Sequence, residues 1–315
     1  MDRKIVTVLG ARGAQGGGLV RAIMADEQGG FAARAVTRDI RSERAKELRA
    51  LGAEVVAADV DDEASLVKAF TGAHAAFCVT FYWAHMSPEK ELAEAAAMAR
   101  AAKRAGVQHV VWSTLEDTRK WVPLSDNRMP TLMGKYKVPH FDAKGEANHF
   151  FADAGVPTTN LVTVFYWDNF IHFGMGPRTG PDGKLVLALP LGESTLGGIA
   201  AEDIGRCAYG VLKGGREYVG QSVGIAGEHL TGVQMAAGLA RALRREVRYE
   251  AVPVEVYRKL GFPGADDLGN MFQFDRDFAG DISRSHSVEV SRRLNPALQT
   301  FDAWLATNAQ HIPLA

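Results

Sequence analysis

The first 165 residues alternate between short apolar runs and longer segments in which apolar residues recur with a helical period. The apolar runs have the length of strands buried on both faces, and the segments between them carry the end signals of helices. One helix begins at Ser87 and Pro88 and is stopped by Gly106, which act as N-cap, first-turn proline and terminating glycine. The predicted strands are residues 5–9, 32–38, 55–59, 75–80, 109–113 and 160–164, and the predicted helices include residues 19–24, 42–51, 61–70 (capped by Asp61) and 87–104.

Strands that alternate with helices predict an α/β fold with a Rossmann-like, doubly wound parallel sheet and right-handed crossovers. We expect residues 1–156 to form a nucleotide-binding domain, with a sixth strand near residues 158–165 returning to its sheet. Residues 166–315 are predicted to form a smaller α/β C-terminal domain that meets a substrate or a partner. Its predicted elements are a strand at 185–189, a helix from Asp203, a helix at 235–243 after a Thr231/Gln234 capping box, a strand at 247–252 and a helix at 254–260.

A glycine-rich turn follows the first predicted strand and leads into a helix. Gly10, Gly13 and Gly16 have the spacing G-x-x-G-x-x-G, a variant found in short-chain dehydrogenase-like folds. In such a turn the backbone N–H groups at the helix N-terminus hold a dinucleotide pyrophosphate. Three glycines can also form a tight turn with no ligand, but their place in the first strand–turn–helix unit favours a dinucleotide site.

The end of the second predicted strand indicates which dinucleotide is bound. Folds that prefer NAD place an acidic residue there for the ribose 2′-hydroxyl, whereas this strand ends in Arg38, which suits a 2′-phosphate. Arg12 and Arg41 are placed to assist, while Asp39 favours the hydroxyl. Solvated charges at a strand end and a helix start are the alternative interpretation of Arg38 and Arg41. We therefore expect NADP(H) as the cofactor.

Composition and charge narrow the class of protein further. The chain has 315 residues, 47% of them hydrophobic, and a net charge of −1, without a run of basic residues that would bind nucleic acid. No leader-like or membrane-spanning run occurs, so we expect a soluble, cytoplasmic protein. Cys78 and Cys207 are expected to be reduced and buried. The nine histidines and two cysteines show no metal-ligand spacing, so no metal site is expected.

These features resemble those of the NmrA-like family, an atypical branch of the short-chain dehydrogenases, and in particular its NADP(H) redox-sensor members. The resemblance extends from Lys4 to about Trp304. Two positions depart from the family pattern: Arg12 replaces a threonine, and Phe81 replaces an asparagine of the redox-sensor members. The segments that carry the resemblance are residues 10–16 (GARGAQG), 36–38 (VTR), 52–56 (GAEVV), 79–83 (VTFYW), 140–146 (HFDAKGE), 168–170 (DNF), 181–184 (PDGK), 202–205 (EDIG) and 261–268 (GFPGADDL).

The resemblance implies a path for the cofactor along the carboxyl ends of the strands, where ligands bind in open α/β sheets. Asp59 is expected beside the adenine, although a simple turn residue is the alternative. The cofactor-binding residues expected are Gly10, Ala11, Arg12, Gly13, Ala14, Gln15, Gly16, Arg38, Asp59, Val60, Thr80, Phe81, Tyr82, Lys144, Val164, Phe165, Tyr166 and Trp167.

The candidate catalytic residues are Lys144, His140 and Ser113. Carbonyl-reducing short-chain dehydrogenases use a Tyr-x-x-x-Lys pair on one helix face and a serine at the end of the fifth strand. Here His140 replaces the tyrosine, and histidine can donate a proton at neutral pH. A packed or capping histidine is the alternative. Tyr136 is a weaker substitute because Pro139 separates it from the helix.

Aromatic residues gather after several of the predicted strands. Four tryptophans, Trp83, Trp112, Trp121 and Trp167, lie at or just beyond strand ends. Phenylalanine and tyrosine side chains cluster with them, so we expect an aromatic-walled pocket over the nicotinamide. Packing against the C-terminal segment is the alternative for any single aromatic side chain.

Two functions remain compatible with these features. The first is an NADPH-dependent reductase of a small apolar or aromatic carbonyl, quinone or imine. The second is a non-catalytic sensor of the NADPH/NADP⁺ balance that acts through a protein partner, with residues 80–83 and 121–136 as its movable segments. The sequence predicts neither a nucleic-acid nor a membrane partner, and it leaves substrate and oligomeric state open.

Overall fold

The computed structural model describes residues 3–314 and contains a seven-stranded sheet in which every pairing is parallel. The strand order is β11-β6-β5-β4-β1-β2-β3, so the chain reverses direction across the sheet between β1 and β4. This arrangement confirms the predicted Rossmann-like fold. The strands are β1 (Lys4–Val8), β2 (Phe31–Thr37), β3 (Glu54–Ala57), β4 (Ala75–Cys78), β5 (His109–Thr114), β6 (Thr158–Val162) and β11 (Ser222–Gly224).

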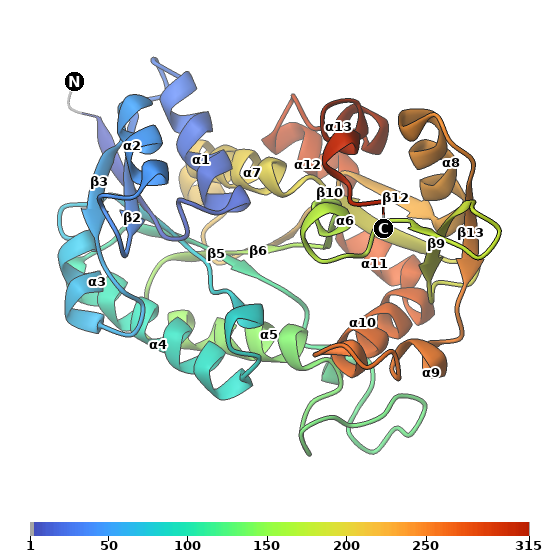
Figure 1. The fold of residues 1–315 in the computed structure, drawn as a ribbon. Helices are drawn as coiled ribbons and strands as arrows, with labels where there is room; N and C mark the ends of the chain where they lie inside the picture. Colours follow the sequence, from blue (N-terminus) through green and yellow to red (C-terminus); the bar gives the residue numbers. More distant parts are fainter. Residues whose placement is uncertain (1–2, 315) are drawn as a thin grey trace.

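Helices cover both faces of this sheet, with α1, α2 and α7 on one side and α3, α4 and α5 on the other (Figure 1). Each face buries its own group of apolar side chains against the strands. The sheet is therefore buried on both faces, as its continuous apolar runs predicted. The helices are α1 (Ala14–Ala25), α2 (Glu43–Ala50), α3 (Glu63–Phe70), α4 (Pro88–Ala105), α5 (Pro139–Asp153) and α7 (Ala201–Gly214), with short 3₁₀ turns η1 (Tyr82–Ala84), η2 (Thr118–Lys120) and η3 (Gly215–Glu217).

The ends of the predicted helices are set by the expected signals in most cases. The Ser87 side chain accepts a hydrogen bond from the backbone N–H of Lys90, and Gly106 ends α4 with a φ of 71°. The predicted cap of α3 is off by one residue. Asp62, and not Asp61, accepts hydrogen bonds from the first-turn N–H groups, because Asp61 N–H itself binds the carboxylate of Asp59.

The second half of the chain builds two small sheets, with strand orders β12-β10-β7 and β13-β9-β8. The predicted capping box at Thr231 and Gln234 is present, whereas the helix predicted at 254–260 makes only one turn. The elements are β7 (Phe165–Tyr166), α6 (Asn169–His172), β8 (Arg178–Thr179), β9 (Leu185–Leu189), β10 (Thr195–Ile199), β12 (Glu228–Thr231), α8 (Gly232–Leu243), β13 (Val247–Ala251), α9 (Val254–Tyr257), α10 (Ala265–Asp277), α11 (Ala279–Ser285), α12 (Val288–Leu294), α13 (Phe301–Asn308) and η4 (Ala309–His311).

Residues 201–224, which the sequence placed in the second domain, belong in space to the first. Strand β11 extends the large sheet beside β6, and α7 packs against α1. Glycines make this helix contact close: a Cβ on Gly205 would overlap the carbonyl oxygen of Gln15, and one on Gly18 would overlap that of Glu202. The two halves therefore share a backbone-to-backbone contact that a boundary drawn along the chain does not reveal.

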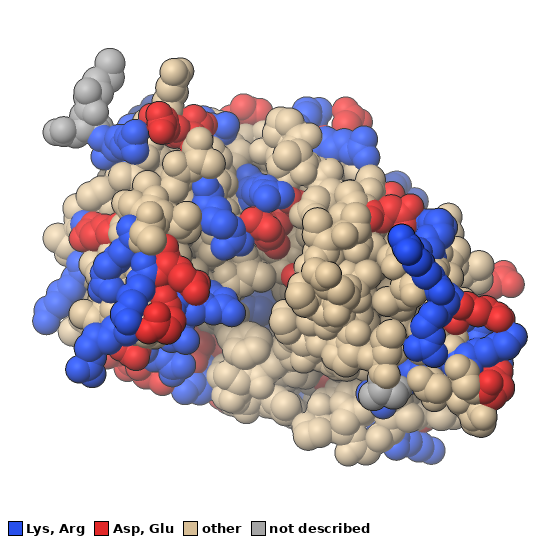
Figure 2. Space-filling model, turned by 45° about the horizontal axis from the view of Figure 1, so that its top comes forward, with Lys and Arg blue, Asp and Glu red and all other residues tan. Residues whose placement is uncertain are grey.

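Figure 2 shows how charge is distributed over one face of the molecule. Lysine, arginine and acidic side chains crowd the nucleotide-binding half, whereas a broad area of the C-terminal half is uncharged, and the surface is hollowed between them (Figure 2). Within the described residues, no helix combines the length and the apolar character needed to cross a membrane.

Candidate functional site

The glycine-rich turn has the geometry of an anion-binding helix start. Gly10 has a φ of +63°, and a Cβ on Gly16 would lie 2.5 Å from the Gly10 carbonyl oxygen, so both positions need glycine. The N-cap of α1 is Gly13, which offers no side-chain acceptor to the first-turn N–H groups. These N–H groups, with the positive end of the helix dipole, are available to a phosphate.

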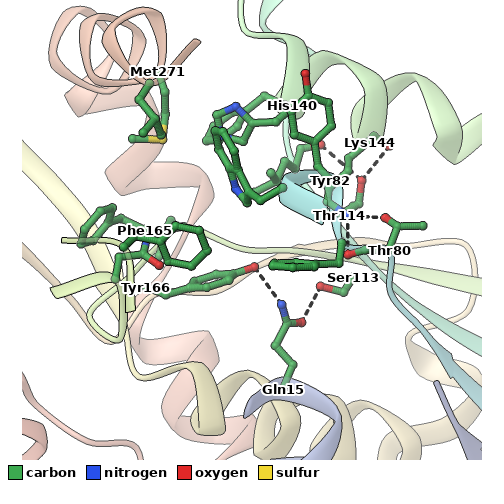
Figure 3. Close-up of a pocket in the computed structure, with 18 of the residues that line it drawn as sticks. Gln15, Thr80, Tyr82, Ser113, Thr114, His140, Lys144, Phe165, Tyr166 and Met271 are labelled. Atoms are coloured by element: carbon green, nitrogen blue, oxygen red, sulfur yellow. Dashed lines mark hydrogen bonds between the residues drawn. The ribbon is translucent and has the colours of Figure 1, made fainter. Parts of the chain in front are cut away.

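Gln15 connects the glycine-rich turn to two other predicted segments (Figure 3). Its side-chain oxygen accepts a 2.7 Å hydrogen bond from the Ser113 hydroxyl at the end of β5, and its amide nitrogen donates to the Tyr166 hydroxyl at 2.9 Å. Tyr166 is also 3.0 Å from the Thr163 hydroxyl. Burial raises the pKa of Tyr166, so its hydroxyl stays neutral at physiological pH.

A cavity of about 870 Å³, including its open mouth, lies beyond the carboxyl ends of β4, β5 and β6, with Gln15 of α1 at its edge. Its largely apolar lining with a few polar groups is typical of a small-molecule site. The predicted residues that line it are Gln15, Thr80, Phe81, Tyr82, Ser113, His140, Lys144, Val164, Phe165 and Tyr166. Trp83 and Phe173, expected in the aromatic wall, and Thr114, next to Ser113, also line it. The residues of this lining that the sequence did not single out are Leu115, Phe141, Asn169, Met175, Leu268 and Met271.

The cavity has an aromatic wall as predicted, but three of the four tryptophans expected in it lie elsewhere. Trp83 lines the cavity, whereas Trp112 packs against Phe151 on the α4–α5 side of the sheet. Trp121 packs against Phe274. Trp167, expected at the cofactor, is 1% exposed and packs among Phe301 and Trp304 in the C-terminal half.

Lys144, on α5, reaches the cavity with its ammonium group held from three sides. It donates to the carbonyl oxygen of Thr80 at 3.2 Å and to the Thr80 hydroxyl, and it forms an ion pair with Glu91 at 2.6 Å. The Trp112 ring lies 5.4 Å from Nζ, on the α4–α5 side. Glu91 is fully buried in the first turn of α4 and was not predicted, because an acidic residue in a first helical turn usually faces solvent.

The second oxygen of Glu91 faces a small buried cluster with His85 and Glu94. His85 Nε2 lies 3.5 Å from Glu91 Oε2 and 3.8 Å from Glu94 Oε1. The three groups are close enough to surround a metal ion. However, His85 Nδ1 accepts a hydrogen bond from the Ser87 backbone N–H, so the proton of the neutral ring is on Nε2, the atom that a metal would need.

We therefore interpret the cluster as a buried place that favours the protonated form of Glu94. Burial and the neighbouring carboxylate of Glu91 together raise the pKa of Glu94 to about 7, while Lys90 opposes the shift. Burial also lowers the pKa of His85. The free oxygen of Glu91 and Nε2 of His85 have no hydrogen-bond partner among residues 3–314.

His140 begins α5 and faces the same cavity (Figure 3). Its Nδ1 is 2.6 Å from a carboxylate oxygen of Asp267, whose second oxygen accepts a hydrogen bond from the His140 backbone N–H at 3.2 Å. Nε2 makes no hydrogen bond within the described part of the chain. Trp83 and Phe141 flank the ring, each with its centre 4.8 Å away. The carboxylate fixes Nδ1 as the proton carrier and leaves Nε2 for a ligand.

Comparison with known proteins identifies the family. The model of the NmrA-like family matches residues 2–305. The chain belongs to the NmrA-like family. It is 27% identical to the NmrA-like family domain-containing oxidoreductase ptmS of Penicillium ochrochloron, over 96% of this chain and 97% of that protein. It is 29% identical to the NAD(P)H azoreductase of Xenophilus azovorans, over 85% and 86% of the two chains. The structure of NmrA, a negative transcriptional regulator, in complex with NADP superimposes with a TM-score of 0.78 at 24% identity, covering 98% of this chain and 95% of that one.

In this NmrA-like protein, Arg38, Asp39 and Arg41, which are expected to distinguish NADP(H) from NAD(H), follow the carboxyl end of β2. Arg38 and Arg12 are exposed, and neither forms an ion pair within residues 3–314. Asp39 accepts a hydrogen bond from the Arg41 backbone N–H at 2.9 Å, which ties its carboxylate into its own turn. The side chain of Arg41 is likewise exposed and forms no ion pair among the described residues, so three arginines near the end of β2 and the glycine-rich turn are available to an anion. Asp59 and Val60 follow β3 and are half-buried.

Proposed function

We propose that this NmrA-like protein is an NADPH-dependent reductase of a small apolar or aromatic acceptor, such as a quinone, a carbonyl or an imine. The observation that carries the proposal is the His140–Asp267 pair at 2.6 Å, which aims the free imidazole nitrogen into an apolar cavity beside Lys144. A general acid needs a nitrogen that a substrate can reach, and Nε2 of His140 makes no hydrogen bond within residues 3–314 while its ring lines the cavity.

The glycine-rich turn supports NADP(H) as the cofactor. The first turn of α1 would hold the pyrophosphate, and Arg38 with Arg12 would bind the 2′-phosphate by charge-assisted hydrogen bonds. Gln15, Ser113, Thr80, Tyr82 and Lys144 border the part of the cavity nearest to this turn. NmrA has been solved with NADP, and the azoreductase is named for its use of NAD(P)H.

The bound cofactor supplies a hydride, and the residues of this chain supply the rest. In its doubly protonated imidazolium form, His140 would give the Nε2 proton to the acceptor oxygen or nitrogen and return to the neutral ring protonated on Nδ1, so that hydride and proton together add two electrons and two hydrogen atoms to the acceptor. Asp267 stabilises the positive charge on the imidazole before that transfer. The Ser113 hydroxyl donates to Gln15 in this structure. To polarise the acceptor oxygen it would turn from Gln15 to the acceptor, and Lys144 fixes a positive charge beside it.

A redox sensor is the second candidate, and it is favoured by the likeness to NmrA, a transcriptional regulator. Such a sensor needs a segment that moves with the cofactor, and residues 80–83 and 121–136 were the two expected ones. The structure fastens the second segment at its end: Asp142 accepts hydrogen bonds from the backbone N–H groups of Lys137 and Val138, and Asn270 donates to the carbonyl oxygens of Pro130 and Lys137. These bonds favour the reductase.

The deciding experiment measures NADPH oxidation by the purified protein against a panel of quinones, aromatic aldehydes, imines and azo compounds. We expect turnover well above the uncatalysed rate for at least one quinone or azo compound. No turnover across the panel, together with a protease pattern in residues 80–136 that differs between NADPH and NADP⁺, would establish the sensor instead.

The cofactor assignment has its own test. Replacing Arg38 by Ala should weaken NADPH binding by about tenfold to a hundredfold, because one charge-assisted contact is worth roughly 1.5–3 kcal/mol. NADH binding should stay unchanged in calorimetry. Arg100→Ala is the matched control, since Arg100 is an exposed arginine on α4 that pairs with Glu63. Equal loss of NADPH and NADH affinity in Arg38→Ala would contradict the assignment.

A further inference from the structure

A second hollow, here called the distal groove, lies beside the cavity that contains His140. Its floor is formed by β9 and β13, and its walls by residues 173–181 and 257–262. It encloses about 1430 Å³ including its open side, more than the cavity itself. Phe173 and Met175 line both spaces. The two hollows are therefore neighbours with a common wall made of two side chains.

The wall between the hollows consists of side chains that can move without the backbone. Met175 is unbranched and adapts to irregular gaps. Phe173 is 44% exposed, and its only aromatic neighbour among the described residues is Trp83, with ring centres 6.3 Å apart. Both side chains can adopt other staggered rotamers, and both stand between the two hollows.

Three large apolar side chains that line the groove are exposed to solvent. Leu260 is 52% exposed and Phe262 39% exposed, and both lie on its rim together with Phe173. Large apolar groups that gather at one concave place usually mark a binding surface. Phe173 and Met175 line both hollows, so an acceptor arm that passes these side chains leaves the cavity and enters the groove.

The charges along the groove indicate a neutral occupant. Arg248 is paired with Asp182 at 2.9 Å. The remaining charged side chains of the lining, Arg178 and Glu250, have opposite signs. A groove without net charge gains most of its affinity from apolar contact.

We propose that the distal groove is the second part of the acceptor site and binds the apolar arm of an elongated, neutral acceptor whose reactive group lies at His140. The proposal rests on the proposed reductase function and defines its substrate class. Two-ring quinones with an alkyl or aryl arm fit this description, because the ring occupies the cavity and the arm follows the wall of Phe173 and Met175 into the groove.

The test compares 1,4-naphthoquinone with 2-hexyl-1,4-naphthoquinone, which differ only in the arm. Each buried methylene contributes about 0.8 kcal/mol, so burial of even two raises kcat/KM for the hexyl compound by roughly tenfold. Leu260→Asp and, separately, Phe262→Ser should remove this preference and leave the rate with 1,4-naphthoquinone unchanged. Val256→Asp is the control, because Val256 is 51% exposed on neighbouring α9 but does not line the groove.

Binding measurements separate failure of this proposal from failure of the reductase function. 2-Naphthol and 6-hexyl-2-naphthol cannot accept a hydride, and their affinities for the NADP⁺-loaded protein are measured by quenching of tryptophan fluorescence. Tighter binding of the hexyl compound that is lost in Leu260→Asp supports the groove even without any turnover. Equal affinities of the two naphthols, or a hexyl preference that survives both groove variants, overturns the proposal even if naphthoquinone is reduced.

Discussion

Lys144 and His140 lie one turn apart on α5 and line the same cavity, but they differ in how far their polar groups are bound by the protein. The Lys144 ammonium donates two hydrogen bonds to Thr80 and forms an ion pair with Glu91. The imidazole of His140 uses one nitrogen for Asp267 and leaves the other free. The lysine is thus held as a fixed charge, whereas the histidine is the group equipped to exchange a proton with a ligand.

The two side chains also depend on different parts of the chain. Thr80 and Glu91, which hold Lys144, come from the segment around η1 and the start of α4 in the nucleotide-binding unit. Asp267, which orients His140, comes from α10, far along the sequence. Changes in the C-terminal half should therefore affect proton transfer, while changes near α4 should affect the charge beside the cofactor.

The largest expected effect is on turnover. His140→Phe should lower kcat by roughly 10²–10⁴-fold and leave NADPH affinity nearly unchanged, because a general acid acts in the transition state. Asp267→Asn keeps the shape but weakens the support of the imidazolium, so it should lower kcat in the same direction by a smaller factor. His149→Phe, at an exposed position of the same helix, is the control. Full activity in His140→Phe would exclude the histidine as the donor.

A smaller effect is expected when the fixed charge is removed. Lys144→Met leaves Glu91 buried without its partner, which should destabilise the protein by about 3–5 kcal/mol. Adding Glu91→Gln to this variant should restore most of the stability, as measured by thermal unfolding. NADPH affinity should remain about tenfold weaker in the double variant. If the double variant binds NADPH as tightly as the parent protein, Lys144 is only the counterion of Glu91.

The smallest effect concerns the buried acids behind Lys144. The folded-state pKa of Glu94, about 7, lies above its ordinary value of 4.5, so the folded protein binds more protons between these values. Its stability should therefore fall as the pH rises from about 4.5 through 7. Glu94→Gln cannot ionise and should melt a few degrees higher than the parent at pH 8, with little difference at pH 5. Parallel pH profiles for the two proteins would show that Glu94 titrates normally.

The large sheet and the cofactor turn were predictable because their signals are local. The six predicted strands of the large sheet all occur, with ends displaced by a few residues at most. Ser87, Pro88 and Gly106 define α4 through their own backbone preferences. A glycine-rich turn after a buried strand likewise needs no information from distant parts of the chain.

The remaining features depend on contacts that no local pattern encodes. Asp267 lies 127 positions from His140, and nothing around it in the sequence marks it as a partner of the histidine. Trp112 ends up on the α4–α5 side of the sheet because alternate residues of β5 face opposite sides, and the apolar run did not reveal which side each residue takes. The return of residues 201–224 to the first sheet was not predicted for a different reason: β11 has only three residues, too few for a clear strand pattern.

The close contact between α1 and α7 has a consequence for the order in which the chain folds. Strand β11 and α7 supply the outer edge of the sheet and the cover of α1, so a nascent chain of 165 residues already has the glycine-rich turn but not its support. Contacts that join such distant segments form late, because long loops must close first. The glycine-rich turn lies within the first 16 residues, but α7 and β11 support it only after the chain has been synthesised through residue 224.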